Sequence, residues 1–176
     1  MAKPVPTTIT GALAGRAALT TCGKRAVAIS MFRKGEGFIG AALAFSREKR
    51  NHGIKDEGFE WVELHLWCQG MEVALKGLLL LRNYDHYIKR LKKPLGHDLL
   101  RIAKEALAAY ALKPLRAGLA TELVQLSQLY SLHLLRYGSG YDLLVNPNTV
   151  PTGKVFHRLS ACFHLAEREL RRASLP

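Results

Sequence analysis

Basic and aromatic side chains occur together in two parts of this chain, a combination that can bind phosphates and stack on bases. The segment 82–96 (RNYDHYIKRLKKPLG) carries two tyrosines among its cations, which include Arg90, Lys92 and Lys93. Cationic side chains neutralise phosphates, and aromatic rings stack on bases of any sequence. Further along, Arg136 and Tyr137 place a planar guanidinium for phosphate beside an aromatic face. These residues are candidates for binding nucleotide or RNA; the alternatives are a solvated loop, tyrosines packed in the core and an ion pair at a helix end.

His97 and Asp98 follow the basic segment at the predicted start of a helix. The carboxylate of Asp98 would complement the positive N-terminal end of that helix, so helix capping is one interpretation of the pair. The other interpretation is a ligand-binding or catalytic role, because an imidazole can act as an acid or a base. Both residues are therefore candidate nucleotide-binding residues.

Apolar residues at alternating three-residue and four-residue steps predict an all-α protein. The clearest case is the segment 59–81, whose apolar stripe consists of Trp61, Leu64, Cys68, Met71, Leu75 and Leu78. On its polar side, Glu72 and Lys76 form an i,i+4 pair worth about a few tenths of a kcal/mol. Similar patterns predict helices over about 37–50, 97–110, 115–137 and 152–173, whereas no strand pattern persists. We therefore predict a single antiparallel bundle of four to five helices.

The N-terminal segment has a composition that does not predict a packed element. Residues 1–30 contain no acidic side chain and are rich in Ala, Thr, Gly and basic residues, as are organelle transit peptides and translated upstream sequence. Met31 is a possible alternative start. We predict that residues 1–33 are poorly ordered or extraneous and that residues 34–176 form the helical bundle.

The overall composition indicates one basic, soluble domain. The chain has 176 residues, and its formal net charge is +12 with a pI near 9.9, which favours an anionic partner. Its three cysteines are far apart and fit a reducing cytosol. No Cys-x-x-Cys or His-x-x-x-His grouping occurs, and the longest apolar run is too short to span a bilayer. We predict a cytoplasmic protein without a metal or other cofactor.

Three groups of residues, taken in order, resemble the HEPN (higher eukaryotes and prokaryotes nucleotide-binding) domain family. They are Gln69, Glu72, Ala74, Leu75 and Lys76; then Gly96-His97-Asp98-Leu99; then Tyr130 with Leu135-Arg136-Tyr137. The match covers about Phe38 to Arg172. The resemblance implies an all-α fold, homodimerisation and association with nucleotide or RNA. It also implies a partner, a minimal nucleotidyltransferase, in a bacterial toxin–antitoxin or defence system.

Catalytic members of that family are metal-independent ribonucleases with an Arg-x(4 to 6)-His motif. Arg136 has no His within that range, but Arg158 and His164 are separated by five residues, although Leu159 replaces the usual polar residue after the Arg. In such a pair the His would act as acid or base and the Arg would stabilise charge on the phosphate. Arg158 and His164 are thus candidate catalytic residues, or else ordinary helix residues. The resemblance predicts a nucleotide-binding or RNA-binding module; the alternatives are a ribonuclease and a protein-interaction bundle.

Overall fold

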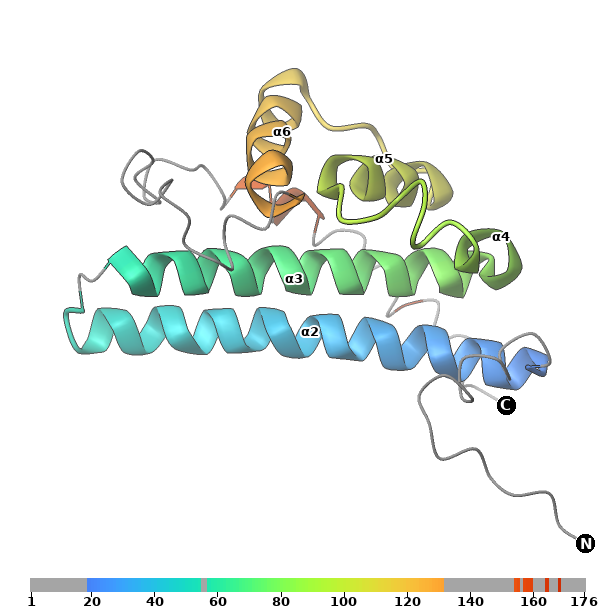
Figure 1. The fold of residues 1–176 in the computed structure, drawn as a ribbon, viewed down its shortest axis with the longest axis horizontal. Helices are drawn as coiled ribbons and strands as arrows, with labels where there is room; N and C mark the ends of the chain where they lie inside the picture. The colour runs from blue at the N-terminus through green and yellow to red at the C-terminus, as the bar shows by residue number, and fades with distance from the viewer. Residues whose placement is uncertain are drawn as a thin grey trace, which may run out of the picture.

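The computed structural model describes residues 19–54, residues 57–131 and seven helical residues between 154 and 168. The regular elements of this described part are all α-helices, in agreement with the predicted all-α class. In chain order they are α2 (Thr21–Asn51), α3 (Glu57–Arg82), α4 (Tyr84–Ile88), α5 (Leu99–Ala109) and α6 (Ala117–Ser131). The two long helices α2 and α3 lie side by side and antiparallel, and the shorter helices lie on the opposite face of α3 (Figure 1).

Small residues repeated every seven positions let α2 approach α3 closely. Ala28, Gly35 and Ala42 share one buried edge of α2, and Gly70 and Gly77 repeat at the same interval on α3. A methyl carbon at Gly35 would lie 2.3 Å from the amide nitrogen of Ala74, and one at Gly77 would lie 2.5 Å from that of Phe32. The two backbones are therefore in contact, and a seven-residue repeat keeps the same edge of each helix facing its partner.

Helix α2 begins earlier than the sequence pattern indicates. The helix begins at Thr21, where the Thr20 hydroxyl accepts a hydrogen bond from the Gly23 amide at 3.1 Å, and both Ala28 and Phe32 are buried. Residues 21–33 are therefore helical, and the helix expected from residue 37 starts 16 residues earlier. Residues 1–18 lie outside the described residues. His52 and Gly53 form the turn that follows α2, with Gly53 at a φ of +62°.

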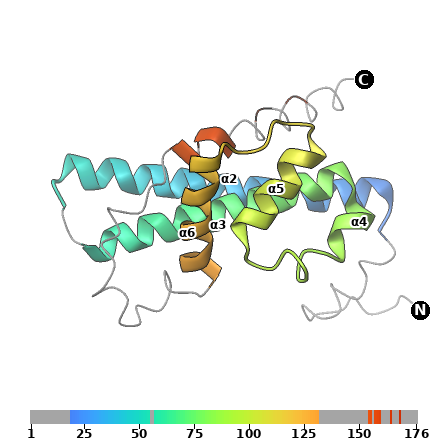
Figure 2. The same ribbon diagram turned by 90° about the horizontal axis from the view of Figure 1, so that it is seen from above.

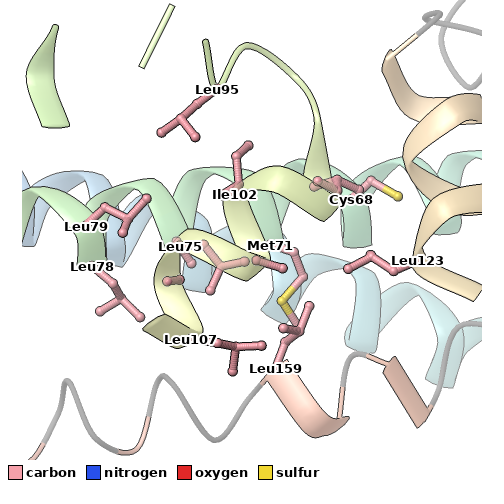
Figure 3. Packing of buried hydrophobic residues seen from close by; sticks show 14 of the residues in the cluster. Cys68, Met71, Leu75, Leu78, Leu79, Leu95, Ile102, Leu107, Leu123 and Leu159 are labelled. Carbon is pink, nitrogen blue, oxygen red and sulfur yellow. The ribbon is translucent and has the colours of Figure 1, made fainter. Parts of the chain in front are cut away.

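The shorter helices lie across α3 and do not extend the antiparallel pair. Seen from above, α6 crosses α3 steeply and α5 crosses it diagonally (Figure 2). Side chains from α3, α5 and α6 meet Leu159 in one apolar cluster (Figure 3). Because α3 is covered by α2 on one side and by α5 and α6 on the other, almost every side chain from Met71 to Leu80 is buried. Within the described part of the chain, no helix is both long and apolar enough to cross a membrane.

Candidate functional site

Some of the residues that carry the family resemblance meet in one polar network that is built on α3. Gln69, Glu72 and Lys76 are spaced by three and four residues, so they lie on one side of that helix. One carboxylate oxygen of Glu72 accepts a hydrogen bond from the Lys76 ammonium at 2.6 Å. The other accepts one from the Tyr130 hydroxyl at 2.5 Å and lies 3.0 Å from Nδ1 of His97. The Tyr130 oxygen also lies 2.8 Å from Oε1 of Gln69.

Glu72 and Lys76 form an ion pair inside the protein. Their side chains are only 5% and 7% exposed. Burial raises the pKa of Glu72, but the charge of Lys76 and the hydrogen bonds from Lys76, Tyr130 and His97 lower it by more, so the pKa is below its ordinary value. Glu72 is therefore a carboxylate at neutral pH. Burial, together with the nearby charge of Glu72, raises the pKa of the Cys68 thiol well above its ordinary value, so Cys68 is not a nucleophile.

Because the pKa of Glu72 is lowered on folding, this network adds stability that depends on pH. The unfolded chain binds the proton more readily, so the stabilisation is present above the unfolded pKa of about 4.5 and is lost as pH falls through the folded pKa. We expect the free energy of unfolding of the wild-type protein to be higher than that of Glu72→Gln at pH 7. This difference should become smaller below about pH 4.5. Urea unfolding from pH 7 to pH 3 measures it. A difference that grew toward acid would contradict this sign.

The Gly-His-Asp-Leu motif forms the end of the basic connector, and each residue has a separate role. Gly96 adopts a φ of +49°, which a glycine reaches without strain, and its carbonyl accepts a hydrogen bond from Lys76 at 2.5 Å. His97 contacts Glu72, and its side chain is 47% exposed. Asp98 caps α5 by accepting a hydrogen bond from the Arg101 amide at 3.0 Å, while Leu99 is buried. The predicted cap at Asp98 is confirmed, whereas His97 faces the buried carboxylate.

The His97 imidazole is held in one orientation and remains accessible to solvent. Because Glu72 is ionised, Nδ1 carries the proton and donates a hydrogen bond to the carboxylate. In the neutral ring, Nε2 is then the acceptor. The ring also meets Tyr130 edge-on, with centroids 6.2 Å apart. A buried carboxylate behind a surface imidazole fixes the tautomer, as the acid does in a catalytic triad. This arrangement can present a hydrogen-bonding group to a ligand or move a proton.

A hollow of about 240 Å³ lies between α5 and α6, beginning at Asp98. Its lining residues are Asp98, Leu100, Val124, Ser127, Gln128 and Ser131. The Ser127 hydroxyl donates to the Asp98 carboxylate at 3.1 Å, which joins α6 to the cap of α5. Asp98, which follows His97 in the sequence, therefore lines this hollow together with polar side chains of α6.

The basic connector separates into structural and exposed residues. The Arg90 guanidinium forms two hydrogen bonds with Glu105, at 2.7 and 3.2 Å, so Arg90 ties the connector to α5. Tyr84 and Tyr87 are buried, which confirms the alternative that they pack in the core. Lys92 and Lys93 are exposed. Of the candidates in this segment, these two lysines remain accessible to a phosphate.

The remaining candidates are not brought into this network by the described contacts. Arg158 donates to the carbonyl oxygen of Lys113 at 2.9 Å, and the His164 side chain is exposed. Arg136 and Tyr137 lie outside the described residues. Among the residues that the structure describes, no group of three or more His, Cys, Asp or Glu side chains is arranged to hold a metal ion.

Sequence reasoning missed that Glu72 and Lys76 are buried, and it did not select Gln69 or Tyr130 as site residues. One signal was available, because Lys76 interrupts the otherwise apolar run from Val73 to Leu81. A charge inside a buried run needs a partner, and Glu72 stands four residues before it.

In comparisons with known proteins, no family model, no curated protein and no solved structure matches the chain.

Proposed function

We propose that this protein is a HEPN-like helical module that binds nucleotide or RNA at the surface around His97, Lys92 and Lys93. It works as a homodimer beside a minimal nucleotidyltransferase in a bacterial toxin–antitoxin or defence system. The observation that carries the proposal is the meeting of Glu72, His97 and Tyr130, which are distant in sequence, in one hydrogen-bonded network. These residues carry the resemblance and are also joined in space, which an accidental resemblance would not require.

The charge of the surface around His97 supports an anionic ligand. Lys92 and Lys93 are exposed in the connector, and Arg101 is exposed on α5, where it lies 3.7 Å from the carboxylate of Asp98. The Arg101 guanidinium donates to the Pro94 carbonyl at 2.7 Å, so the start of α5 lies against the same connector. Cations around an oriented imidazole provide both countercharge and a hydrogen-bonding group for a phosphate.

Removing two cations from this surface is expected to weaken RNA binding. Each phosphate contact contributes about −0.7 to the slope of log K against log salt for single strands, so Lys92→Ala/Lys93→Ala should reduce the slope by about 1.4. Fluorescence anisotropy of a labelled single-stranded RNA at several KCl concentrations measures affinity and slope.

The matched control is Arg33→Ala/Lys34→Ala, which removes the same charge from two exposed residues of α2. We expect the control to retain the wild-type slope. Equal slopes in all three proteins, or binding without salt dependence, would reject this surface and favour the protein-interaction bundle.

RNA integrity in the same samples tests the ribonuclease alternative. The Arg158 guanidinium is engaged by the Lys113 carbonyl, so we favour binding without cleavage. Cleavage by the wild-type protein that is lost in His164→Ala would reverse this choice. Cleavage that is unchanged in His164→Ala would exclude Arg158 and His164 as the catalytic pair.

A further inference from the structure

His97 connects a buried carboxylate to the surface of the protein. Its Nδ1 atom lies 3.0 Å from an oxygen of Glu72, whose side chain is only 5% exposed. The His97 side chain itself is 47% exposed. The imidazole is therefore held from the inside of the protein and also borders solvent, so a change in its charge acts directly on the surface around it.

The charged and titratable side chains near this imidazole come from four parts of the fold: Glu72 and Lys76 of α3, Lys92 and Lys93 of the connector, Asp98 and Arg101 at the start of α5, and Tyr130 of α6. Carboxyl, ammonium, guanidinium and phenol groups ordinarily titrate outside the range from pH 5 to pH 8, and imidazole titrates within it. Burial raises the pKa of Glu72, but the charge of Lys76 and the hydrogen bonds hold it below its ordinary value, so Glu72 stays ionised at pH 5.5. His97 is thus the member of this set whose charge responds to mild acidification.

A proton can be added to His97 without breaking its contact with Glu72. In the neutral ring Nδ1 already donates to the carboxylate, so the next proton is added at Nε2. The charged ring then forms an ion pair with Glu72 in the same orientation. Protonation also changes Nε2 from a hydrogen-bond acceptor, which phosphate oxygens repel, into a donor. Mild acid therefore adds a positive charge to this surface and keeps the network intact.

We propose that protonation of His97 strengthens RNA binding at the surface around His97, Lys92 and Lys93, an inference that rests on the proposed function. The sign follows from linkage. RNA binds the charged ring more tightly than the neutral one, so binding takes up a proton and the affinity rises as pH falls. A charge-assisted hydrogen bond to a phosphate oxygen corresponds to a gain of about tenfold in affinity.

Fluorescence anisotropy of the full chain with a rhodamine-labelled oligouridylate, at pH 8.0 and pH 5.5 in the same KCl concentration, measures this gain. Uracil has no group that titrates in this range, and the oligomer carries no terminal phosphate, because a phosphate monoester changes charge near about pH 6. We expect the wild-type affinity to be about tenfold higher at pH 5.5. The slope of log K against log salt should become steeper there by about 0.7, as one more phosphate contact requires. Circular dichroism at both pH values verifies that the fold is the same.

The decisive variant is His97→Gln, whose amide can donate a hydrogen bond to Glu72 but is not protonated in this range. Its affinities at pH 5.5 and pH 8.0 should be equal. The matched control is His52→Gln, because His52 is also an exposed imidazole beside a carboxylate, 3.3 Å from Glu48, and lies in the turn after α2. This control should keep the wild-type gain at pH 5.5. A tenfold gain that persists in His97→Gln would overturn the proposal.

Two further results separate this proposal from the proposed function. RNA binding that depends on Lys92 and Lys93 but has equal wild-type affinity at both pH values would overturn the role of His97 and leave the proposed function standing. Absence of RNA binding at both pH values would reject both. His86 is another exposed imidazole of the connector. Loss of the gain in His86→Gln, with the gain retained in His97→Gln, would assign the pH response to His86 and overturn the proposal.

Discussion

Replacing Glu72 with methionine is expected to lower the free energy of unfolding by about 3–5 kcal/mol, the largest effect of a single polar substitution that we predict for this fold. The substitution leaves the Lys76 ammonium, whose side chain is 7% exposed, without its counter-charge. The Gly96 carbonyl is the other acceptor bonded to that ammonium, and a neutral oxygen cannot replace a carboxylate at 2.6 Å. Urea unfolding at pH 7, followed by circular dichroism, measures the change.

Two controls separate the buried charge from a general effect of the substitution. The double variant Glu72→Met/Lys76→Met removes both charges and should regain most of the lost stability, since apolar groups of similar size replace buried ion pairs well. Glu36→Met removes the acidic partner of Arg33, an exposed pair with the same 2.6 Å separation, and should cost less than about 1 kcal/mol. Equal losses in Glu72→Met and Glu36→Met would show that the pair inside the protein is solvated.

A single methyl group on Gly35 is expected to destabilise the protein by about 3 kcal/mol. The added carbon would lie 2.3 Å from the amide nitrogen and 2.6 Å from Cα of Ala74. These are backbone atoms, which cannot rotate away, so α2 must move from α3 and weaken the contacts along the pair. Urea unfolding of Gly35→Ala measures this loss.

Gly37→Ala provides a control in the same helix with the opposite expected sign. A methyl group there meets nothing within 4 Å. Alanine is a better helix former than glycine, so this variant should gain about 0.5–1 kcal/mol. A loss of stability in both variants, or in neither, would contradict the close contact between the two backbones.

Long amphipathic stripes were the part of the fold that the sequence predicted well. The helix expected over 59–81 is α3 (Glu57–Arg82), and the Asp98 cap is where the local signals place it. Each depends on interactions within a few residues. Val155 and Leu159, which lie in the helix expected over 152–173, are also buried.

The features that sequence reasoning missed depend on surfaces brought together by the tertiary fold. The early part of α2 buries Ala28, Phe32 and Gly35, and one large apolar side chain among small ones gives almost no hydrophobic pattern. The Glu72–Lys76 spacing is the same in a solvated pair and a buried one, and only the helices that cover α3 decide between them. Likewise, the exposed appearance of Arg90 in the sequence gave no indication of its partner Glu105, which lies 15 residues later on α5.

The connector that presents His97 is attached to α3 at two successive residues, through the Gly96 carbonyl and the imidazole itself. Binding of the proposed ligand at His97 would therefore change the thermal stability of the protein. A ligand that binds the exposed part of the ring without displacing Glu72 leaves both attachments intact and adds its binding free energy to the folded state. One that competes for Nδ1 detaches the ring from Glu72 and loosens the centre of the protein. The change in melting temperature thus shows whether a bound molecule has displaced Glu72 from the imidazole.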